Sequence, residues 1–278
     1  MSNVGMTNEH YNPADLVLRL RAALASVSAN DGHLTPEELA PLDQFHSRGL
    51  DATIELAEKL QIDRLSRVLD IGAGLGGPSR YLVSRYGCKV YGVDLSESFV
   101  EAANFLAERT GLEDRLTYFC GNALALPFDS GTFDIAWTQH VAMNIADRSR
   151  FYAEAFRVLR PGGRFAIFDV VSTSDEPLHF PVPWARDPSS SFLLSNEGME
   201  QELQKQGFCT IEWIDSTAAG ISWFAERAKE RAASGAPPRL GIHLAMGADF
   251  ADMAANLARN LREGRAGLVQ VIVEKPLA

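Results

Sequence analysis

The sequence has few cysteines and no long apolar run. Its 278 residues include three cysteines, Cys88, Cys120 and Cys209, which are too far apart for metal-ligand spacing and whose odd number suits a reducing compartment. No stretch of 18 apolar residues occurs, and no basic segment followed by an apolar one opens the chain. We therefore expect a cytoplasmic protein without membrane insertion, whose cysteines are small buried residues.

The chain also lacks an excess of positive charge. Lys and Arg number 26 against 36 Asp and Glu, which gives a net charge of −10. Affinity for nucleic acid depends on Lys and Arg side chains that meet phosphates, so the composition disfavours a nucleic-acid partner. A hydrophobic content of 46% is typical of a globular protein that buries a full core.

Three motifs of covalent and metal-assisted catalysis are missing. The sequence contains no G-x-S-x-G, no H-E-x-x-H and no C-x-x-C. The first marks the nucleophile of α/β-hydrolases, the second a zinc protease, and the third a redox or zinc site. The sequence therefore supports none of these classes.

Short β-branched runs alternate with helical segments through the middle of the chain. RVLDIG, KVYGVDL, RLTYFCG, FDIAWTQ and RFAIFDVV alternate with GPSRYLVSRYG, SESFVEAANFLAERTG and RSRFYAEAFRVLRPGG. This alternation is typical of βαβ units and of an α/β sheet covered by helices on both faces. With the later runs FCTIEWIDS and GLVQVIVEKP, the pattern predicts a doubly wound, mostly parallel sheet of seven strands with a Rossmann-like arrangement.

Helical segments flank this core. Residues 1–62 read as a helical N-terminal cover, with Pro13 at a first helical position and Thr35 as a helix N-cap. Residues 63–278 form the expected core, including a proline-rich lid segment at 172–195 and a helical insertion at 218–263 before the last strand.

A glycine-rich turn ends the first predicted strand. Gly72, Gly74, Gly76 and Gly77 follow VLDI, and glycines at a strand end allow a tight turn and a close approach of ligand to backbone. The spacing also satisfies G-x-G-x-x-G, so a dinucleotide is possible. Asp94 lies twenty residues after Gly74, where a carboxylate can accept hydrogen bonds from a ribose. Both features indicate an adenosine-containing cofactor, and a purely structural turn with Asp94 as a helix cap remains an alternative.

Asp70 discriminates between the possible cofactors. It lies in an otherwise apolar strand just before the glycines, where a buried carboxylate needs a partner such as the loop amides or a ligand ammonium. A pyrophosphate gains nothing from an extra negative charge nearby, whereas a cofactor with an amino-acid tail does. The sequence therefore favours S-adenosylmethionine.

With these motifs, the chain resembles the class I S-adenosylmethionine-dependent methyltransferases. The resemblance is carried by VLDIGAGLGG, GVDLS, GNALALPFDSGTFDIAW and RVLRPGGRFAIFD. It implies that Asp94 holds the ribose, that Asn122 and Ala123 flank the adenine, and that Gln139 reaches the methionine moiety. The cofactor-binding residues expected on this basis are Asp70, Gly72, Gly74, Gly76, Asp94, Leu95, Asn122, Ala123 and Gln139.

Further segments resemble the sarcosine/dimethylglycine N-methyltransferase-like branch of that family. They are LDQFHSRGLDATIELAEKL, QHVAMNIADRSRFYAEAFRVLRPGG and FPVPWARDPSSSFL. The resemblance implies a small-molecule acceptor, with an amine of the glycine-derivative type as the first choice. C-methylation of an isoprenoid, quinone or other natural product is the alternative. An NAD(P)-dependent oxidoreductase is the alternative from another class.

Residues at strand ends and in the flanking segments are the candidates for acceptor binding. His140 and His46 are the candidate catalytic groups, as a base or as residues that orient the acceptor, and ordinary structural histidines are the alternative. The expected acceptor-binding residues are Tyr11, Met143, Asn144, Trp184, Arg186 and Trp223; Trp184 would face a cationic or aromatic group and Arg186 would pair with a carboxylate. No metal ligand is expected, and homo-oligomer formation stays open.

Overall fold

The computed structural model describes residues 15–27, 33–234, 239–247 and 249–277. Its centre is a seven-stranded sheet with the order β3-β2-β1-β4-β5-β7-β6. All pairings are parallel except those of β7, which runs antiparallel to both of its neighbours. The predicted mostly parallel sheet is therefore confirmed. The strands are β1 (Arg67–Ile71), β2 (Lys89–Asp94), β3 (Leu116–Cys120), β4 (Phe133–Gln139), β5 (Leu159–Ser172), β6 (Cys209–Asp215) and β7 (Ala266–Glu274).

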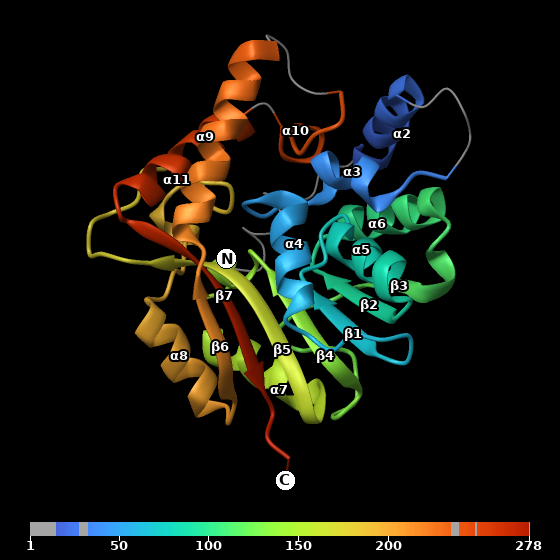
Figure 1. The fold of residues 1–278 in the computed structure, drawn as a ribbon, viewed down its shortest axis with the longest axis vertical. Coiled ribbons are helices and arrows are strands. Elements are labelled where there is room, and N and C mark those ends of the chain that lie inside the picture. Colours follow the sequence, from blue (N-terminus) through green and yellow to red (C-terminus); the bar gives the residue numbers. More distant parts are fainter. Residues whose placement is uncertain (1–14, 28–32, 235–238, 248, 278) are drawn as a thin grey trace.

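Helices connect these strands and cover both faces of the sheet (Figure 1). They are α5 (Gly77–Tyr86), α6 (Glu97–Thr110), α7 (Arg148–Val158) and α8 (Asn196–Lys205). The helix predicted to continue to Gly163 ends at Val158, and β5 begins at Leu159. Pro161 explains the difference, because proline has no backbone N–H and disfavours helical backbone in the residue before it.

Helices α2 (Leu16–Val27), α3 (Pro36–Asp43) and α4 (Gly49–Glu58) precede the sheet. Thr35 caps α3 as predicted: its hydroxyl accepts from the Glu38 amide, and the Glu38 carboxylate accepts from the Thr35 amide. Leucines of α2 and α3 pack with α6 in one buried cluster, which includes Leu16, Leu20, Leu39, Leu42, Phe99 and Leu106. The division of the chain at residue 62 stays a prediction.

The segment before the last strand forms α9 (Thr217–Ser234), α10 (His243–Met246) and α11 (Phe250–Arg262). Figure 1 shows these helices above the same edge of the sheet as α2 and α3. The parallel strands end at this edge, so it is where an open α/β sheet binds its ligands.

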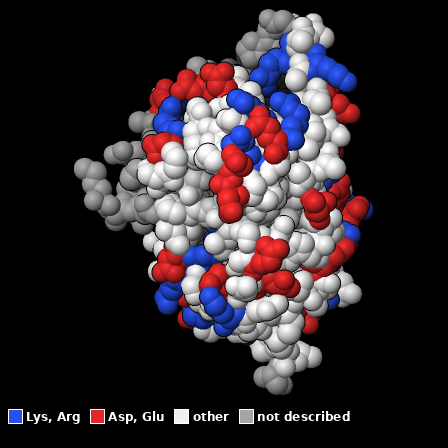
Figure 2. All heavy atoms as spheres, turned by 90° about the vertical axis from the view of Figure 1, so that its left-hand side faces the viewer, with Lys and Arg blue, Asp and Glu red and all other residues white. Residues whose placement is uncertain are grey.

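Figure 2 shows Lys and Arg side chains interspersed with Asp and Glu over one face of the molecule. No helix of the described residues is both long and apolar enough to cross a bilayer. Of the three cysteines, Cys88 is buried whereas Cys120 and Cys209 are exposed, so the expectation that all three are buried was wrong. Cys120 and Cys209 lie at the ends of the edge strands β3 and β6, where neighbouring residues cover less of the side chain.

Candidate functional site

A cavity of about 350 Å³ lies at the carboxyl ends of the central strands, below α10 and the start of α11. Most of the residues predicted for the site line it. They are His46, Asp70, Gly72, Gly74, Asp94, Leu95, Asn122, Ala123, Gln139, His140, Met143, Asn144 and Trp184.

The glycine loop turns tightly and uses its amides within the protein. Gly72 has φ +79°, and a Cβ there would lie 2.3 Å from a methyl carbon of Val141, so only glycine fits. The amides of Gly72 and Ala73 donate to the Val93 carbonyl at 2.8 and 3.1 Å. The Gly74 amide donates to Asp94 Oδ2 at 2.8 Å. These three amides are therefore not available to a phosphate.

Gly76 does not line the cavity, although we predicted it for the cofactor site. It is the N-cap of α5 with φ +74°, and a Cβ there would lie 2.2 Å from the Tyr118 hydroxyl. Tyr118 in turn donates to the Gly76 carbonyl at 3.4 Å. Glycine is thus required at this position by backbone conformation and by packing against Tyr118.

Asp70 is buried at the floor of the cavity, with an exposed fraction of 2%. The Ser79 hydroxyl donates to its Oδ2 at 2.6 Å. We expected the loop amides or a ligand as partners, so the first half of that prediction was wrong: the partner comes from α5. Burial raises the pKa of Asp70 to about 7, against the lowering effect of the Ser79 bond. Asp70 therefore retains part of its proton near neutral pH.

Asp94 ends β2 and faces the cavity together with Leu95. Besides the Gly74 amide, its carboxylate accepts from the Ser96 amide at 2.9 Å, while Ser96 itself caps α6. Burial raises the pKa of Asp94 against these hydrogen bonds. The carboxylate thus fixes the loop and remains at the cavity wall.

The loop after β3 brings Asn122 and Ala123 to the cavity. The Asn122 side chain accepts from the Leu124 amide at 2.8 Å, which holds the turn in shape. Because β3 pairs with β2 and Cys120 lies opposite Asp94, this loop lies beside the end of β2 that carries Asp94.

Asp43 is a cavity residue that the sequence analysis missed. Its Oδ2 accepts from Arg80 at 2.6 Å in an ion pair whose side chains are 1% and 0% exposed. Its Oδ1 is buried without a hydrogen-bond partner among the described residues. Burial raises the pKa of Asp43 to about 6 despite Arg80. The sequence contains one signal that could have identified Asp43: it is an acidic residue that follows Leu42 directly and lies at helical spacing from Leu39.

Gln139 also has an unsatisfied polar atom at the cavity. Its Oε1 accepts from the Trp137 indole at 3.0 Å and from the Thr53 hydroxyl at 3.2 Å. These bonds fix the amide so that Nε2 is its free donor, and this atom has no partner within the described part of the chain. An acceptor group of a ligand would satisfy it.

His46 contacts protein groups with both ring nitrogens. Nδ1 lies 3.2 Å from the Ser47 carbonyl, and Nε2 lies 3.0 Å from Gln44 Oε1 and 3.1 Å from the Thr53 hydroxyl. Burial lowers the pKa of His46 to about 4, so the ring is neutral near pH 7. With both nitrogens engaged, His46 supports the cavity wall, and the predicted catalytic role does not fit this geometry.

His140 differs from His46 in having a ring nitrogen without a partner in the described part of the chain. It follows β4 with φ +53°, a conformation that a residue other than glycine adopts only at a cost. Its amide donates to the Phe168 carbonyl at 2.7 Å, and its ring packs 4.8 Å from that of Phe168. Its Nε2 has no hydrogen-bond partner among the residues described. Burial lowers the pKa of His140 well below 6.5, and the nearby His46 is the second, smaller cause of this shift. The cavity thus contains a neutral imidazole.

Met143, Asn144 and Trp184 form the adjoining wall. Met143 is 2% exposed, and its carbonyl accepts from the Phe192 amide at 2.9 Å. Trp184 is 3% exposed and its indole N–H donates to the Ser191 hydroxyl at 2.9 Å. The proline-rich segment therefore closes one side of the cavity.

The remaining predicted acceptor residues lie elsewhere. Arg186 pairs with Asp249 at 3.1 Å, with both side chains 59% exposed, and it does not line the cavity. Trp223 lies on α9, where it packs beside Gly49 and under Arg227. Neither residue lines the cavity in this structure, so their predicted contact with the acceptor stays a prediction. Tyr11 lies outside the described residues.

The cavity suits a ligand with an amino-acid end. Asp43 Oδ1 would accept from an ammonium and Gln139 Nε2 would donate to a carboxylate, and both atoms lack partners in the described regions. Asp94 and Asn122, for which the resemblance implies contacts to the ribose and the adenine, line the same cavity. No group of three or more His, Cys, Asp and Glu residues in the described ranges could hold a metal ion.

Comparisons with known proteins agree with this geometry. Residues 69–167 match the protein family described as "Methyltransferase domain". The chain is 33% identical over 164 residues to "Methyltransferase GfsG" of Streptomyces halstedii, over 59% of this chain and 57% of that protein. It is 36% identical over 177 residues to the sarcosine/dimethylglycine N-methyltransferase of Halorhodospira halochloris, over 64% of this chain and 63% of that protein. The match thus spans less than two thirds of each relative.

A solved structure with the same fold covers the whole chain. The crystal structure of the [4+2]-cyclase SpnF superposes with a TM-score of 0.70 over 100% of this chain and 97% of that one, at 23% sequence identity. At this identity the likeness concerns the fold. Residues 69–167, which contribute strands to the seven-stranded sheet, are thus similar to the family described as a methyltransferase domain.

Proposed function

We propose that the protein transfers a methyl group from S-adenosylmethionine to a small-molecule acceptor. One observation supports this proposal most: the amides of the glycine loop donate hydrogen bonds to Val93 and Asp94 and are not free for a phosphate. In addition, the carboxyl groups of Asp43 and Asp70 line the same cavity. Such surroundings attract cations and repel a pyrophosphate. They favour a cofactor that carries an ammonium and a sulfonium.

The cofactor would be held along the whole strand edge. Asp94 would hold the ribose, Asn122 and Ala123 the adenine, and Asp70, Asp43 and Gln139 the amino-acid end. When bound, the cofactor supplies an electrophilic methyl group. The protein's contribution is then to align the acceptor with that group and to exclude water, and alignment of reacting atoms supplies much of the rate enhancement in such displacements.

His140 would bind the reactive group of the acceptor. Its ring is neutral and its Nε2 has no partner in the described regions, so it can accept a proton from a hydroxyl or an amine as the methyl group arrives. The Phe168 ring and the backbone bond from His140 to Phe168 hold it in place. The unusual backbone conformation at residue 140 supports a functional role, because strained residues cluster at active sites.

Two other functions use the same fold. A nicotinamide-dependent oxidoreductase would need loop amides for its pyrophosphate, and three of these amides are engaged here. A protein of this fold without methyl transfer is the other candidate, since the solved structure of similar fold is named as a cyclase.

Ligand binding and turnover separate these functions. S-adenosylhomocysteine should raise the melting temperature of the purified protein and NAD should not, because binding to the native state alone stabilises it. A shift with NAD and none with S-adenosylhomocysteine contradicts the proposal. Incubation with S-adenosylmethionine carrying a labelled methyl group, and a panel of neutral, anionic and cationic small molecules, should transfer label to at least one of them. Cofactor binding without transfer to any acceptor would indicate the non-transferring alternative.

The role of His140 is tested with His140→Asn. Asparagine adopts a positive φ more readily than most residues, so this variant should keep the fold and the affinity for S-adenosylhomocysteine. Loss of the imidazole should lower kcat by roughly 10² to 10⁴-fold, the usual contribution of a general base. An unchanged kcat would remove His140 from the chemistry while leaving the cofactor assignment intact.

A further inference from the structure

The charged groups that line the cavity are all acidic. Asp43, Asp70, Asp94 and Asp147 line it, and no Lys or Arg of the described residues does. The undescribed residues, 1–14, 28–32, 235–238, 248 and 278, contain no Lys or Arg either. A carboxylate or phosphate on the acceptor would therefore meet no side-chain cation, and burying an unpaired charge is costly.

The two histidines of the cavity do not replace the missing cation. Burial lowers the pKa of His46 to about 4, and burial together with His46 keeps the pKa of His140 well below 6.5. Both rings are therefore neutral near pH 7. Asp147, an exposed residue whose carboxylate caps α7 at the cavity wall, is likewise acidic and offers an anionic acceptor no pairing.

Apolar side chains from separate parts of the chain converge on the same space. Phe45 follows α3, Met143 follows β4, Met246 ends α10 and Phe250 begins α11. Trp184, from the loop after β5, also lines this space. Methionine and aromatic side chains bind apolar rings well through polarisable surface.

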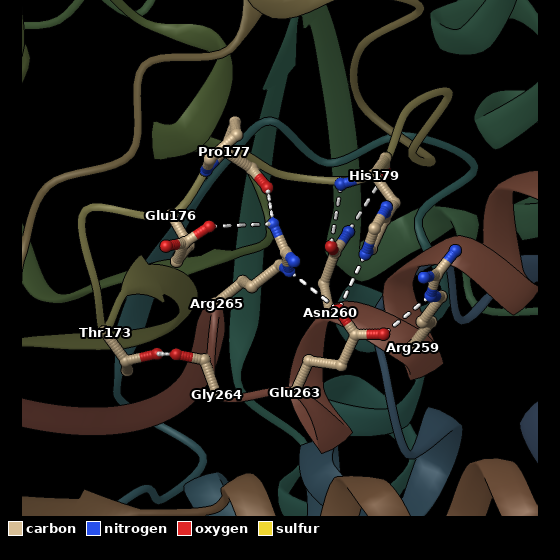
Figure 3. Close-up of polar contacts among 9 residues, drawn as sticks. All are labelled: Thr173, Glu176, Pro177, His179, Arg259, Asn260, Glu263, Gly264 and Arg265. Carbon is tan, nitrogen blue, oxygen red and sulfur yellow. Dashed lines mark hydrogen bonds and ion pairs between the residues drawn. The ribbon is translucent and has the colours of Figure 1, made fainter.

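The segment that carries Trp184 is fastened to the protein. We call residues 173–191 the strap. Figure 3 shows its first part tied to α11 and to the turn between α11 and β7: Asn260 donates to the His179 carbonyl at 3.0 Å and accepts from the His179 amide at 2.8 Å. Arg265 donates to the Pro177 carbonyl at 2.5 Å, and Glu263 pairs with His179 at 2.7 Å.

The fastened strap makes the Trp184 wall a preformed surface. The Trp184 indole donates a hydrogen bond to the Ser191 hydroxyl. Beside it, Val182 and Ala185 are buried, and their backbone groups form two hydrogen bonds with each other. A preformed wall costs little entropy when an acceptor binds. Its shape and polarity therefore select among acceptors.

We propose that the acceptor is an uncharged, largely apolar molecule that offers one hydroxyl or neutral amine to His140, and that the acidic, cation-free lining rejects carboxylate and phosphate acceptors. This inference rests on the proposed methyl transfer and specifies its substrate. The acceptor proposed here differs from the glycine derivative expected from the sequence, because a glycine derivative carries a carboxylate.

A matched pair of probes tests the inference on protein saturated with S-adenosylhomocysteine. Calorimetric titration with 1-naphthol and with 1-naphthoate compares one ring system as a neutral hydroxyl and as an anion. We expect 1-naphthol to bind at least about tenfold more tightly, because only the anion buries an unpaired charge. Equal or tighter binding of 1-naphthoate, binding of neither probe, or methylation of sarcosine in preference to neutral acceptors would overturn the inference.

The variant Met246→Lys tests the missing cation directly. Met246 is half-buried at the cavity lining, so a lysine there can reach solvent with its stem against the apolar wall. We expect it to bring the affinity for 1-naphthoate to that for 1-naphthol or above, while the control Met246→Leu keeps the preference for 1-naphthol. An unchanged preference in Met246→Lys would show that lining charge does not select the acceptor.

These experiments distinguish a failure of the proposed function from a failure of the acceptor inference. Loss of the proposed function would appear as no binding of S-adenosylhomocysteine in the first step. Failure of the acceptor inference would appear with S-adenosylhomocysteine bound and the naphthyl probes ranked in the opposite order.

Discussion

Asp94 holds the glycine loop through the Gly74 amide and also borders the cavity. Asp94→Ala should weaken binding of S-adenosylhomocysteine by about 1 to 3 kcal/mol, the range for a lost hydrogen bond to a charged group. Isothermal titration calorimetry measures this change. Asp94→Asn keeps one acceptor oxygen and should lose less. Equal affinity of the wild type and both variants would argue against a ribose contact.

If Asp70 binds the proposed cofactor, we expect the affinity for that cofactor to depend on pH. Burial raises its pKa to about 7 and that of Asp43 to about 6, so both carboxyls hold protons more tightly than in an unfolded chain. A bound ammonium favours the ionised forms, so binding releases protons and the affinity rises with pH. Below about pH 7, affinity for S-adenosylmethionine should fall by up to tenfold per pH unit and per group. Titrations in buffers of different ionisation enthalpy measure the released protons.

The matched variant for this dependence is Asp70→Asn. It cannot release a proton, so the pH dependence just below pH 7 should flatten while the weaker contribution of Asp43 remains at lower pH. A wild-type affinity that stays constant between pH 5.5 and 8 would contradict the coupling.

The place of a residue at the cavity was predictable where it depends on local spacing. Gly72, Gly74 and Asp94 follow from a strand, a turn and the next strand end, all within thirty residues of sequence. Asp43 was missed because its meaning depends on Arg80, which lies 37 positions away. The contacts of His46 with Thr53 and of Arg186 with Asp249 were not predictable for the same reason.

At the scale of elements, the strap depends on α11. Asn260 is fully buried and satisfies both backbone groups of His179. Asn260→Ala leaves these groups unpaired and should lower the free energy of unfolding by about 2 to 3 kcal/mol. The control Asn256→Ala removes one bond, to the Pro181 carbonyl, and should cost about 1 kcal/mol. Urea unfolding gives both values. A larger loss in Asn256→Ala would show that Asn260 is not the main fastening.

The proline content of the strap predicted an irregular segment, which is what the structure contains. Its attachment was not predictable, because the partners Asn260 and Arg265 are more than eighty positions away. The strands were easier, since β-branched runs between helices identify buried parallel strands without knowledge of their neighbours. The order of β6 and β7 in the sheet was not predictable in this way, because it depends on contacts between distant parts of the chain.

At the scale of the whole molecule, the ion pair of Asp43 and Arg80 joins α3 to α5 through the core. Asp43→Ala leaves the buried Arg80 without its carboxylate and should destabilise the protein by about 3 to 5 kcal/mol. The double variant Asp43→Leu with Arg80→Met removes both charges and should recover most of that stability. Thermal and urea unfolding measure both effects.

The double variant also separates structure from binding. We expect it to fold yet to bind S-adenosylhomocysteine less tightly than the wild type, because the unpartnered Oδ1 of Asp43 is gone. Wild-type affinity in a well-folded double variant would leave Asp43 with a purely structural role.

The position of β7 has a consequence for how the protein is made. β7 lies between β5 and β6, and within the described residues β6 pairs with β7 alone. The ribosome delivers residues 209–215 before residues 266–274, so β6 emerges with no neighbour to join and must wait for about fifty further residues. During that interval the open edge of β5 is exposed to other nascent chains, which is the kind of edge that chaperones shield.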